Sequence, residues 1–477
     1  MIARRLRTAA AIVLAAGAIA ATPAAAPGEA ATATYFASIR KNPSLLLAFL
    51  AEMPKGGDLH NHISGAIYAE SYLRWAADDG MCFSVATMAI VNGTCDAGAG
   101  RPAAADLLRN SNPLFDQAVD AMSMRHWDPS LDGHDHFFAT FDKFRLTSSS
   151  RTGDMLAELA ARAAAEHVSY LELMATTEGG IGATRGIAAG WDPDLPKLRD
   201  KLLAAGFRDA ISSAARTRLD DAEARKRALL ECGTPKASPG CLTTIRYIYQ
   251  VGRASSPQAV FGQMLAGFEI ATADPRVVSL NLVQPEDDPI AARDFSLQMS
   301  MLDYLHTQYP AVKLTLHAGE LTEGLVPPET LRFHIRESIR TGHASRIGHG
   351  TGVMFEDDPL ALLREMASNK VLVEVALSSS DLILGVRGPR HPLNTYLKYG
   401  VPVALVTDDA GVSRSTLTLE FRKAVEEQGV DYRTLKRMAR NSIDYSFADA
   451  ATKGRLRADL DAAFRAFEAR QTRRPTS

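Results

Sequence analysis

The stretch Lys313-Leu-Thr-Leu-His-Ala-Gly319-Glu320 is a short apolar run that ends in polar and charged residues. Short runs without strict polar alternation are typical of strands buried on both faces, as in a parallel sheet. The 477-residue chain contains eight runs of this kind, most of them separated by amphipathic stretches of helical period. They are Asp58–Ile63, Ser169–Ala175, Thr243–Val251, Val277–Val283, Lys313–Gly319, Arg346–Gly350, Val371–Leu377 and Pro402–Asp409. Eight strands alternating with helices predict an α/β fold, specifically a (β/α)8 TIM barrel.

Two connections are longer than a simple crossover helix requires. Residues 66–150 separate the first and second predicted strands, and residues 182–241 separate the second and third. We interpret both as helical insertions at the mouth of a barrel that spans residues 53–450. Residues 27–52 form a segment before the barrel, and residues 451–477 are expected to form a C-terminal helix and tail.

The first 26 residues differ in character from the rest of the chain. Arg4, Arg5 and Arg7 precede an apolar, Ala-rich stretch, Ala9–Ala21, and small residues follow it. This order is typical of a secretory signal peptide. We therefore interpret residues 1–26 as a signal peptide and expect export to the periplasm or the extracellular space. A retained membrane anchor is the alternative, although the apolar stretch is short for a bilayer span.

The four cysteines form two closely spaced pairs, Cys82 with Cys95 and Cys232 with Cys241. In an oxidising compartment such pairs usually become local disulfides, so a disulfide is expected in each pair. A zinc site built from all the thiolates is the alternative, but neither pair has the close Cys-x-x-Cys type of spacing that such sites use.

The formal charge of the chain is −2, and no long basic run occurs. Domains that bind nucleic acid usually carry a basic patch, so no nucleic-acid partner is expected. After removal of the signal peptide we expect no membrane contact. The expected partner is a small molecule, and the oligomeric state is left open.

Histidines and carboxylates lie at the ends of predicted strands, where TIM barrels carry their active sites. The first strand ends in Asp58-Leu59-His60-Asn61-His62. Because side chains alternate along a strand, His60 and His62 share one face, as two ligands of one metal ion require. The fifth strand ends in His317, and Glu320 follows directly.

Two further strands end in the same way. His349 lies in the sixth run, and Asp408-Asp409 ends the eighth. Three histidines and one carboxylate suit a first-row metal ion with a place left for water. A second His-x-His pair, His134 and His136, lies in a polar stretch away from any predicted strand, and we interpret it as surface or gate structure.

In this order the motifs resemble those of the adenosine deaminase family of the amidohydrolase superfamily. The resemblance covers roughly residues 50–450 and rests on Met53-Pro54-Lys55, His60-x-His62, His317-Ala-Gly-Glu320, His349 and Thr407-Asp408-Asp409. The leader, the cysteine-bearing insertion and the stretch Lys55-Gly-Gly-Asp58 are closest to the secreted, growth-factor-related branch.

The resemblance implies one Zn²⁺ per chain, with a ligand set made of His60, His62, His317 and Asp408. It also implies roles for their neighbours. Glu320 would transfer a proton to the purine ring, His349 would orient the attacking water, and Asp409 would contact the purine. A carboxylate favoured by a helix N-terminus is the structural alternative for Glu320.

Three positions depart from the family pattern where the substrate is expected. Gln284 follows the fourth strand at a place where the family usually has a glycine beside the purine. Ser64 stands where cytosolic members carry an aspartate near the sugar, and Ala410 replaces the usual proline after Asp409. Gln284, Ser64 and Asp409 are the expected substrate contacts, and recognition of the sugar and the ring edge stays open.

Together these features predict a zinc-dependent hydrolase that converts adenosine or a related purine nucleoside to an inosine-type product and ammonia. The alternatives within this chemistry are a deaminase of adenine, of a modified adenosine or of another aminated heterocycle. A third hypothesis is a nucleoside-binding or extracellular signalling protein without turnover. The intact Glu320, His349 and Asp408 argue against a decayed site of that kind.

Overall fold

The structure is a computed structural model that describes residues 27–109, 112–128 and 130–472, so the expected signal peptide lies outside it. Eight parallel strands form one sheet in the order β1-β4-β5-β6-β7-β8-β9-β10. They are β1 (Gly56–His62), β4 (Val168–Ala175), β5 (Thr244–Gly252), β6 (Val277–Val283), β7 (Lys313–Ala318), β8 (Arg346–His349), β9 (Leu372–Val375) and β10 (Val403–Leu405). Each strand overlaps one of the apolar runs in the sequence, and the predicted TIM barrel is confirmed.

The sheet closes into a barrel between its first and last strands. Asn61 in β1 forms a parallel bridge with Asp408, which follows β10. The N–H of Asp408 donates to the carbonyl of His60 at 2.9 Å, and the N–H of His62 donates to the carbonyl of Asp408 at 3.3 Å. Closure of the barrel therefore brings the backbones of these three residues together.

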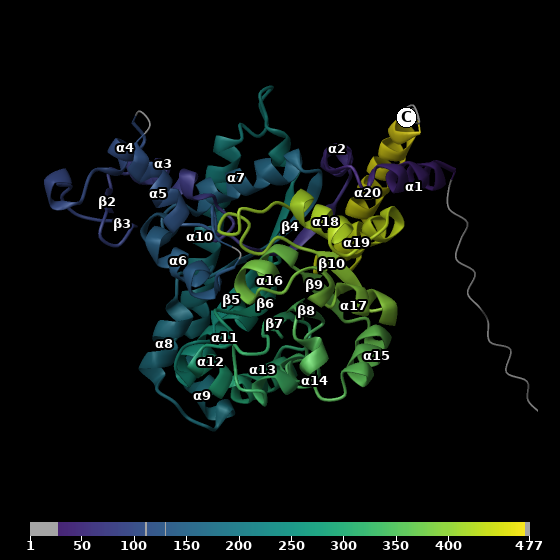
Figure 1. The fold of residues 1–477 in the computed structure, drawn as a ribbon. Coiled ribbons are helices and arrows are strands. Elements are labelled where there is room, and N and C mark those ends of the chain that lie inside the picture. The colour runs from purple at the N-terminus through teal and green to yellow at the C-terminus, as the bar shows by residue number, and fades with distance from the viewer. Residues whose placement is uncertain (1–26, 110–111, 129, 473–477) are drawn as a thin grey trace, which may run out of the picture.

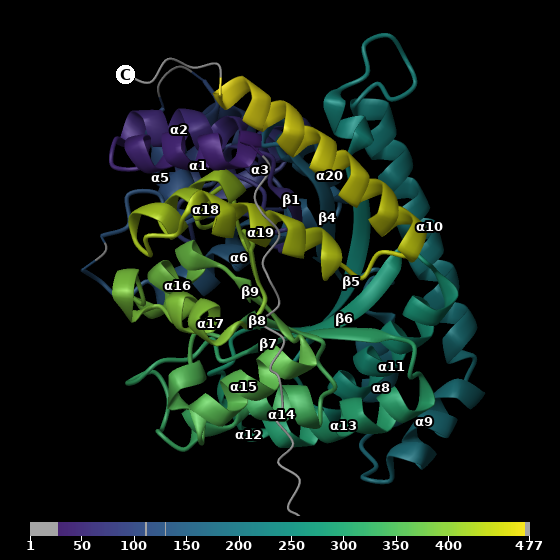
Figure 2. The ribbon, with the colours of Figure 1, turned by 90° about the vertical axis from the view of Figure 1, so that its right-hand side faces the viewer.

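Helices cover the outside of the barrel, because strands that are apolar on both faces must be buried on both. Those that follow β5 to β10 are α11 (Pro257–Ala273), α12 (Pro289–Arg293), α13 (Phe295–Gln308), α14 (His334–Arg340), α15 (Pro359–Asn369), α16 (Leu377–Leu384), α17 (Leu393–Tyr399), α18 (Leu417–Glu426) and α19 (Tyr432–Asp444). The start of α15 shows why such helices begin where they do. The Asp358 side chain accepts from the N–H of Ala361 at 3.2 Å, and Pro359 occupies the first turn. Figure 2 shows these helices around the strands.

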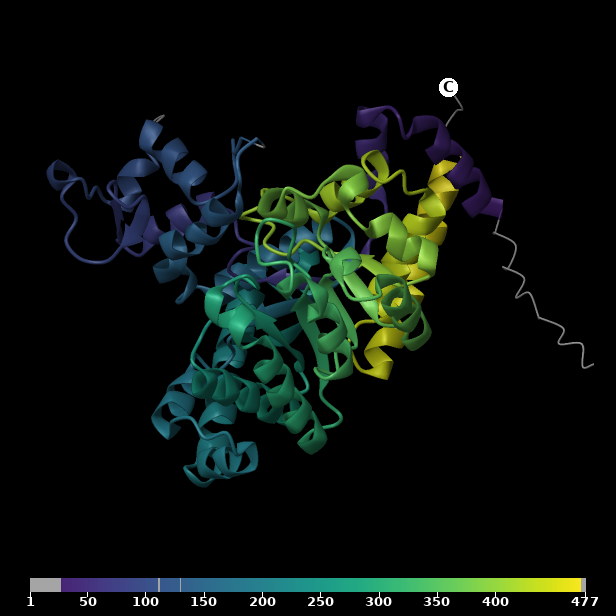
Figure 3. The same ribbon diagram turned by 60° about the horizontal axis from the view of Figure 1, so that its bottom comes forward.

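The connection from β1 to β4 carries the first insertion. Its elements are α3 (Ala69–Asp78), β2 (Cys82–Ser84), β3 (Ala89–Val91), α4 (Ala104–Leu107), α5 (Pro113–Ala121), α6 (His134–Ser148) and α7 (Thr152–Ala165), of which α7 leads into β4. Cys82 and Cys95 form the expected disulfide next to the β2–β3 hairpin. The hairpin side of the insertion projects from the barrel in Figures 1 and 3, whereas α6 packs back against α16.

The connection from β4 to β5 is the second insertion, and it is helical. It contains α8 (Ile181–Ala189), α9 (Leu195–Ala204) and α10 (Phe207–Leu229). Cys232 and Cys241 form the second expected disulfide after α10. Because α10 packs on α7 and α11, this insertion extends the helical layer beside the barrel.

The two ends of the described chain pack together. The helices α1 (Pro27–Ile39), α2 (Pro43–Glu52) and α20 (Ala450–Gln471) lie close to one another in Figures 1 and 2. The C-terminal helix therefore covers the segment before the barrel. Within the described residues, no helix combines the length and the apolar character needed to cross a bilayer.

Candidate active site

Four side-chain atoms from three strand ends meet at the mouth of the barrel. Nε2 of His317 lies 3.0 Å from Nε2 of His60 and 3.2 Å from Nε2 of His62. Oδ1 of Asp408 lies 3.4 Å from Nε2 of His60 and 3.2 Å from Nε2 of His62. Ligands about 2.0 Å from a tetrahedral ion are about 3.3 Å apart, so these atoms have the spacing of a metal site.

Hydrogen bonds on the far ring nitrogens fix the tautomers of two of these histidines. Nδ1 of His60 donates to Oε2 of Glu374 at 2.7 Å, and Nδ1 of His317 donates to Oδ1 of Asn281 at 2.9 Å. The Nε2 lone pairs of His60 and His317 therefore face each other at 3.0 Å. Facing lone pairs repel unless a cation lies between them, so the donor set fits a first-row metal ion such as zinc.

Asp408 is held on the side away from the histidines. Ser379, in α16, donates its hydroxyl to Oδ2 of Asp408 at 2.8 Å. The other oxygen, Oδ1, is buried, and it has no hydrogen-bond partner among the described residues. One carboxylate oxygen of Asp408 is thus hydrogen-bonded to the protein, and the other can bind a ligand.

Glu320 and His349 form a second buried pair in this region. Nδ1 of His349 lies 3.3 Å from Oε1 of Glu320. Burial raises the pKa of Glu320 well above its usual value, and the negative charges of Asp408 and Glu286 raise it further. An upward shift of the pKa favours the protonated carboxyl group, the form that can act as an acid.

Asp409 occupies space that only a glycine at position 65 leaves free. A Cβ atom on Gly65 would overlap the carboxylate of Asp409. Burial raises the pKa of Asp409 well above its usual value, and the charge of Asp408 adds to the shift. Within the described residues its Oδ1 has no hydrogen-bond partner, so this atom is available to a bound molecule.

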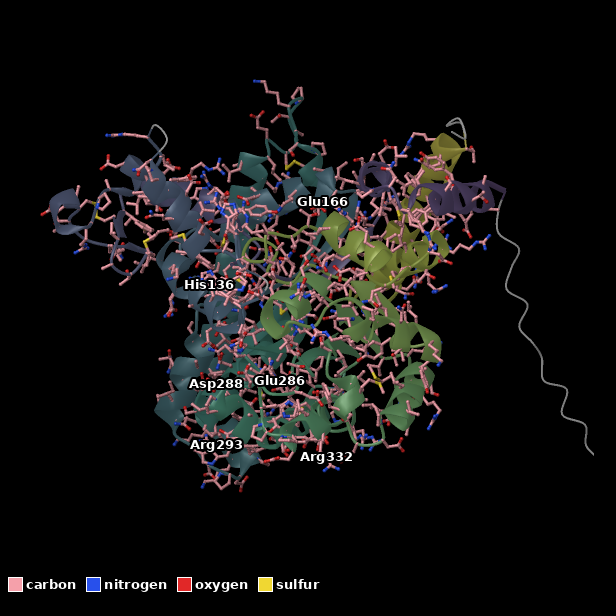
Figure 4. The ribbon with its side chains drawn as sticks, viewed as in Figure 1. His136, Glu166, Glu286, Asp288, Arg293 and Arg332 are labelled. Atoms are coloured by element: carbon pink, nitrogen blue, oxygen red, sulfur yellow. A yellow bond between two sulfur atoms is a disulfide. The ribbon has the colours of Figure 1, made fainter. Side chains whose placement is uncertain are left out.

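The backbone that carries Glu320 is held by a residue that the sequence analysis did not select. Glu286, labelled in Figure 4, accepts from the N–H of Gly319 at 3.1 Å and from the N–H of Glu320 at 2.8 Å. It also accepts from Nδ1 of His334 at 2.5 Å. Its one signal in the sequence is its place just after a predicted strand.

Three residues of the site adopt the left-handed backbone conformation. The φ angles are 80° at Gln284, 65° at His349 and 57° at Asp408. Non-glycine residues in sparsely populated conformations cost about 1–3 kcal/mol each and concentrate at functional sites. At Gln284 this conformation is the one that the family's usual glycine adopts readily. The Gln284 side chain accepts from the N–H of Ala254 at 3.0 Å, so its amide is turned toward the backbone of the preceding loop.

The cluster opens into a cavity of about 450 Å³, a volume that suits a small molecule. Seven of the residues singled out in the sequence line it: His62, Ser64, Gln284, His317, Glu320, Asp408 and Asp409. The expected substrate contacts therefore share one cavity with the acid and the metal-type ligands. Phe137, Phe138 and Phe141 of α6 form an apolar wall that the sequence analysis did not name.

His134 and His136 lie outside this cluster. They occupy the first turn of α6 instead of a loop. Nε2 of His134 lies 3.1 Å from Oδ1 of Asp287, and His136, labelled in Figure 4, donates from Nε2 to the carbonyl of Ser123 at 3.0 Å. Neither histidine belongs to a metal-sized group of ligands among the described residues.

Curated relatives match about a third of this chain. An aminodeoxyfutalosine deaminase of Streptomyces avermitilis is 34% identical over 146 residues, which are 30% of this chain and 38% of the relative. An adenine deaminase of Sinorhizobium medicae is 32% identical over 149 residues, which are 31% of this chain and 42% of the relative. An adenosine deaminase of Enterococcus faecalis is 30% identical over 155 residues, which are 32% of this chain and 42% of the relative. The chain thus aligns with about two fifths of the length of these relatives.

Solved structures share the fold over most of the chain. An adenine deaminase of Arthrobacter aurescens superimposes with a TM-score of 0.55 at 19% identity, over 86% of this chain and 99% of its own. The N6-mAMP deaminase of Arabidopsis superimposes with a TM-score of 0.57 at 20% identity, over 87% of this chain and 99% of its own. An amidohydrolase of Burkholderia ambifaria with bound Zn superimposes with a TM-score of 0.57 at 18% identity, over 89% of this chain and 94% of its own. The adenosine deaminase family model matches residues 134–463, more than half of the chain, and the chain therefore belongs to the adenosine deaminase family.

Proposed function

We propose that this protein is a zinc-dependent hydrolase that removes the amino group from a purine nucleoside, with adenosine as the reference substrate. The observation that carries the proposal is the cluster of Nε2 and Oδ1 atoms 3.0 to 3.4 Å apart, in one cavity with Glu320. The proposed product is an inosine-type nucleoside with release of ammonia.

The proposed ligands of one zinc ion per chain are His60, His62, His317 and Asp408. A zinc ion supplies a water molecule of lowered pKa, near 7, as the nucleophile for such a reaction. Glu374 and Asn281 orient the imidazoles of His60 and His317, and Ser379 orients Asp408. Partners of this kind raise ligand basicity and fix the ring positions, which supports the assignment.

Glu320 is the proposed proton carrier. Attack on the carbon that bears the amino group pushes electrons onto the adjacent ring nitrogen, so an acid must stand beside that nitrogen. The raised pKa of Glu320 favours its protonated carboxyl, the form that can act as this acid. His349, 3.3 Å from Glu320, is proposed to orient the attacking water and to stabilise the charge that develops on it.

Asp409 is the proposed ring contact. Its raised pKa favours the protonated form, which can donate a hydrogen bond to a ring nitrogen. Gln284 and Ser64 line the same cavity and are the proposed contacts at the ring edge and the sugar. The phenylalanines of α6 supply an apolar surface for the heterocycle.

The relatives' names do not narrow the substrate, since they name adenine, adenosine and aminodeoxyfutalosine deaminases. All three names are those of deaminases, and this supports the reaction class. Adenine, a modified adenosine or another aminated heterocycle is therefore the second candidate substrate. A binding protein without turnover is disfavoured because His349, Glu320 and Asp408 are present together in one buried site.

We further propose that the mature protein is exported and lies near the secreted, growth-factor-related branch of the family. The support is the leader-like composition of residues 1–26 and the disulfides Cys82–Cys95 and Cys232–Cys241. Such bonds persist in oxidising compartments and are rare in the cytosol.

The test is an ammonia-release assay on the purified full chain loaded with zinc, with metal content measured on the same sample. The panel contains adenosine, adenine and N6-methyladenosine, and formation of the 6-oxo product is followed for each. Deamination of adenosine supports the leading proposal, and activity on one of the other compounds alone supports the second candidate. Zinc loading with nucleoside binding but without any product would contradict both.

A further inference from the structure

A second cavity, of about 960 Å³, adjoins the catalytic cavity. Four residues line both cavities and so mark their junction: Ser64, Arg145, Ser148 and Gln250. Through this junction the second cavity is open to the far end of a molecule held at the metal cluster. The side chains of the second cavity therefore determine which chemical group the far end of the substrate can carry.

We infer that this protein acts on purine nucleosides that carry an anionic group remote from the reacting amine, and that Arg218 binds this group in the second cavity. The inference rests on the proposed function, because it names the substrate class of the same site. A phosphate and a carboxylate share the required chemistry, since both pair with a guanidinium through charge-assisted hydrogen bonds.

Arg218 differs from the other arginines that line the second cavity. Arg151 binds Asp79 and Asp154, Arg225 binds Asp154, and Arg145 binds Asp142. Arg218 is exposed and forms no hydrogen bond or ion pair among the described residues, so its guanidinium is free to bind an anion. Asp221, one turn farther along α10, also lines the cavity but is not paired with Arg218.

The Arg218 guanidinium lies close to a glycine. Gly179 follows β4 with a φ of 78°, and a Cβ atom there would lie 3.2 Å from Nη1 and 3.3 Å from Cζ of Arg218. The guanidinium thus lies against the loop at the carboxyl end of a barrel strand, the face on which TIM barrels bind their ligands.

Two threonines of the same loop line the same cavity as Arg218. Thr176 accepts a hydrogen bond from Nε2 of Gln250 at 3.1 Å, so its hydroxyl hydrogen is left for another acceptor. Thr177 lines the cavity, is 3% exposed, and has no hydrogen-bond partner for Oγ1 among the described residues. A buried hydroxyl without a partner costs free energy, which an anionic oxygen at this place would recover.

Gln250 connects this loop to the reacting end. It lies in β5, lines both cavities and binds Thr176, so the two cavities are joined by one side chain of the barrel. A molecule that fills both cavities contacts the metal cluster at one end and the Thr176–Gly179 loop at the other.

The test measures kcat/KM of the zinc-loaded full chain for adenosine, 5′-AMP, 3′-AMP and adenosine 5′-carboxylic acid. We expect at least one anionic compound to exceed adenosine about tenfold or more, and the pattern distinguishes a phosphate from a carboxylate. In Arg218→Ala the ratio of kcat/KM for that compound to kcat/KM for adenosine should fall by about 10- to 100-fold, the usual worth of a charged hydrogen bond. Arg225→Ala removes a cation of the same helix and cavity that is already paired, and should keep the wild-type ratio.

Equal or better turnover of adenosine than of all three anionic compounds would overturn the inference, as would an unchanged ratio in Arg218→Ala. Binding of the products inosine, inosine 5′- and 3′-monophosphate and inosine 5′-carboxylic acid, measured by calorimetry, keeps the test separate from catalysis. If no compound is deaminated but Arg218→Ala selectively weakens binding of the anionic products, the proposed function fails while the anion site stands. If the anionic products bind no better than inosine, the anion site fails whatever the turnover.

Discussion

Nδ1 of His60 donates a 2.7 Å hydrogen bond to Oε2 of Glu374, across the interior of the barrel from β1 to β9. The other oxygen of Glu374 accepts from Nε of Arg346 at 2.5 Å, and Arg346 also donates to Glu172 at 2.6 Å. A buried chain of charges therefore runs through the barrel core and ends on the imidazole of His60. Its role is to hold the ring with Nε2 directed at the metal cluster.

Replacement of Glu374 tests this role. In Glu374→Gln the amide cannot provide the charged acceptor for Nδ1 of His60, so zinc affinity should fall about 10- to 100-fold, as measured by competition with a chelator. Glu172→Gln is the matched control, because Glu172 binds Arg346 but not His60. Both variants should lose stability of about 3 kcal/mol, since each leaves the buried Arg346 short of one carboxylate. Equal zinc affinity in the two variants would refute the positioning role.

Replacement of Glu320 tests the proton carrier. Glu320→Gln has nearly the same shape but cannot donate and recover a proton, so kcat should fall by about 10²- to 10⁴-fold. Zinc content should stay at the wild-type level, because no ligand atom is changed. Metal analysis and ammonia release on the same sample make the check, and undiminished turnover would remove Glu320 from the mechanism.

The sequence predicts the strands and the metal-type ligands well, because both follow local rules. Strands of a parallel barrel are continuous apolar runs, and functional side chains come directly after them, as His317 and Asp408 do. The partners of those ligands follow no local rule. Glu374 and Asn281 meet His60 and His317 only because separate strands share one barrel interior. A lone charged or amide residue within an apolar run was the available signal for both.

The wall of the catalytic cavity was harder to predict for a related reason. The sequence places an insertion at the barrel mouth, but the periodicity of α6 does not reveal which part of the barrel it covers. The packing of α6 against α3, β3 and α16 places Phe137, Phe138 and Phe141 at the cavity. Glu286 was missed because it accepts hydrogen bonds from the backbone N–H groups of Gly319 and Glu320, and such bonds leave no signal in the sequence.

Gly65→Ala should abolish the function of Asp409 although no catalytic side chain is replaced. The added Cβ atom would overlap the Asp409 carboxylate and force it from its place, so kcat/KM should fall by at least about tenfold. Gly454→Ala is the control, since a Cβ atom there meets nothing within 4 Å and lies in a helix, where alanine is favoured by up to about 1 kcal/mol. Steady-state kinetics of the two variants give the comparison. Full activity in Gly65→Ala would show that the position of Asp409 is unimportant.

Glu420, which accepts hydrogen bonds from the start of the helix that carries Ser379, should make the stability of the protein depend on pH. Glu420 accepts from the N–H of Leu377 at 2.7 Å and from the N–H of Ser378 at 3.1 Å, and burial raises its pKa from 4.5 to about 7. The folded state therefore binds more protons than the unfolded state between these pH values. Stability contributed by the protonated group is full below about pH 4.5 and is lost as the pH rises through 7.

Urea unfolding at pH 5 and pH 8 measures this effect. The wild-type protein should lose up to about 3 kcal/mol from this group between the two pH values, and Glu420→Gln should lack that part of the change. The comparison uses the difference between the two proteins, so titration of other groups cancels. An identical pH dependence in the variant would show that Glu420 is not responsible.

The central claim is that His60, His62, His317 and Asp408 hold one catalytic zinc ion. The most direct measurement is an anomalous-difference map, recorded at the zinc absorption edge, from crystals of the zinc-loaded chain. The account predicts one strong peak per chain, about 2.0 Å from Nε2 of each histidine and from Oδ1 of Asp408. No peak between these atoms, or a peak held instead by His134 and His136, would contradict it.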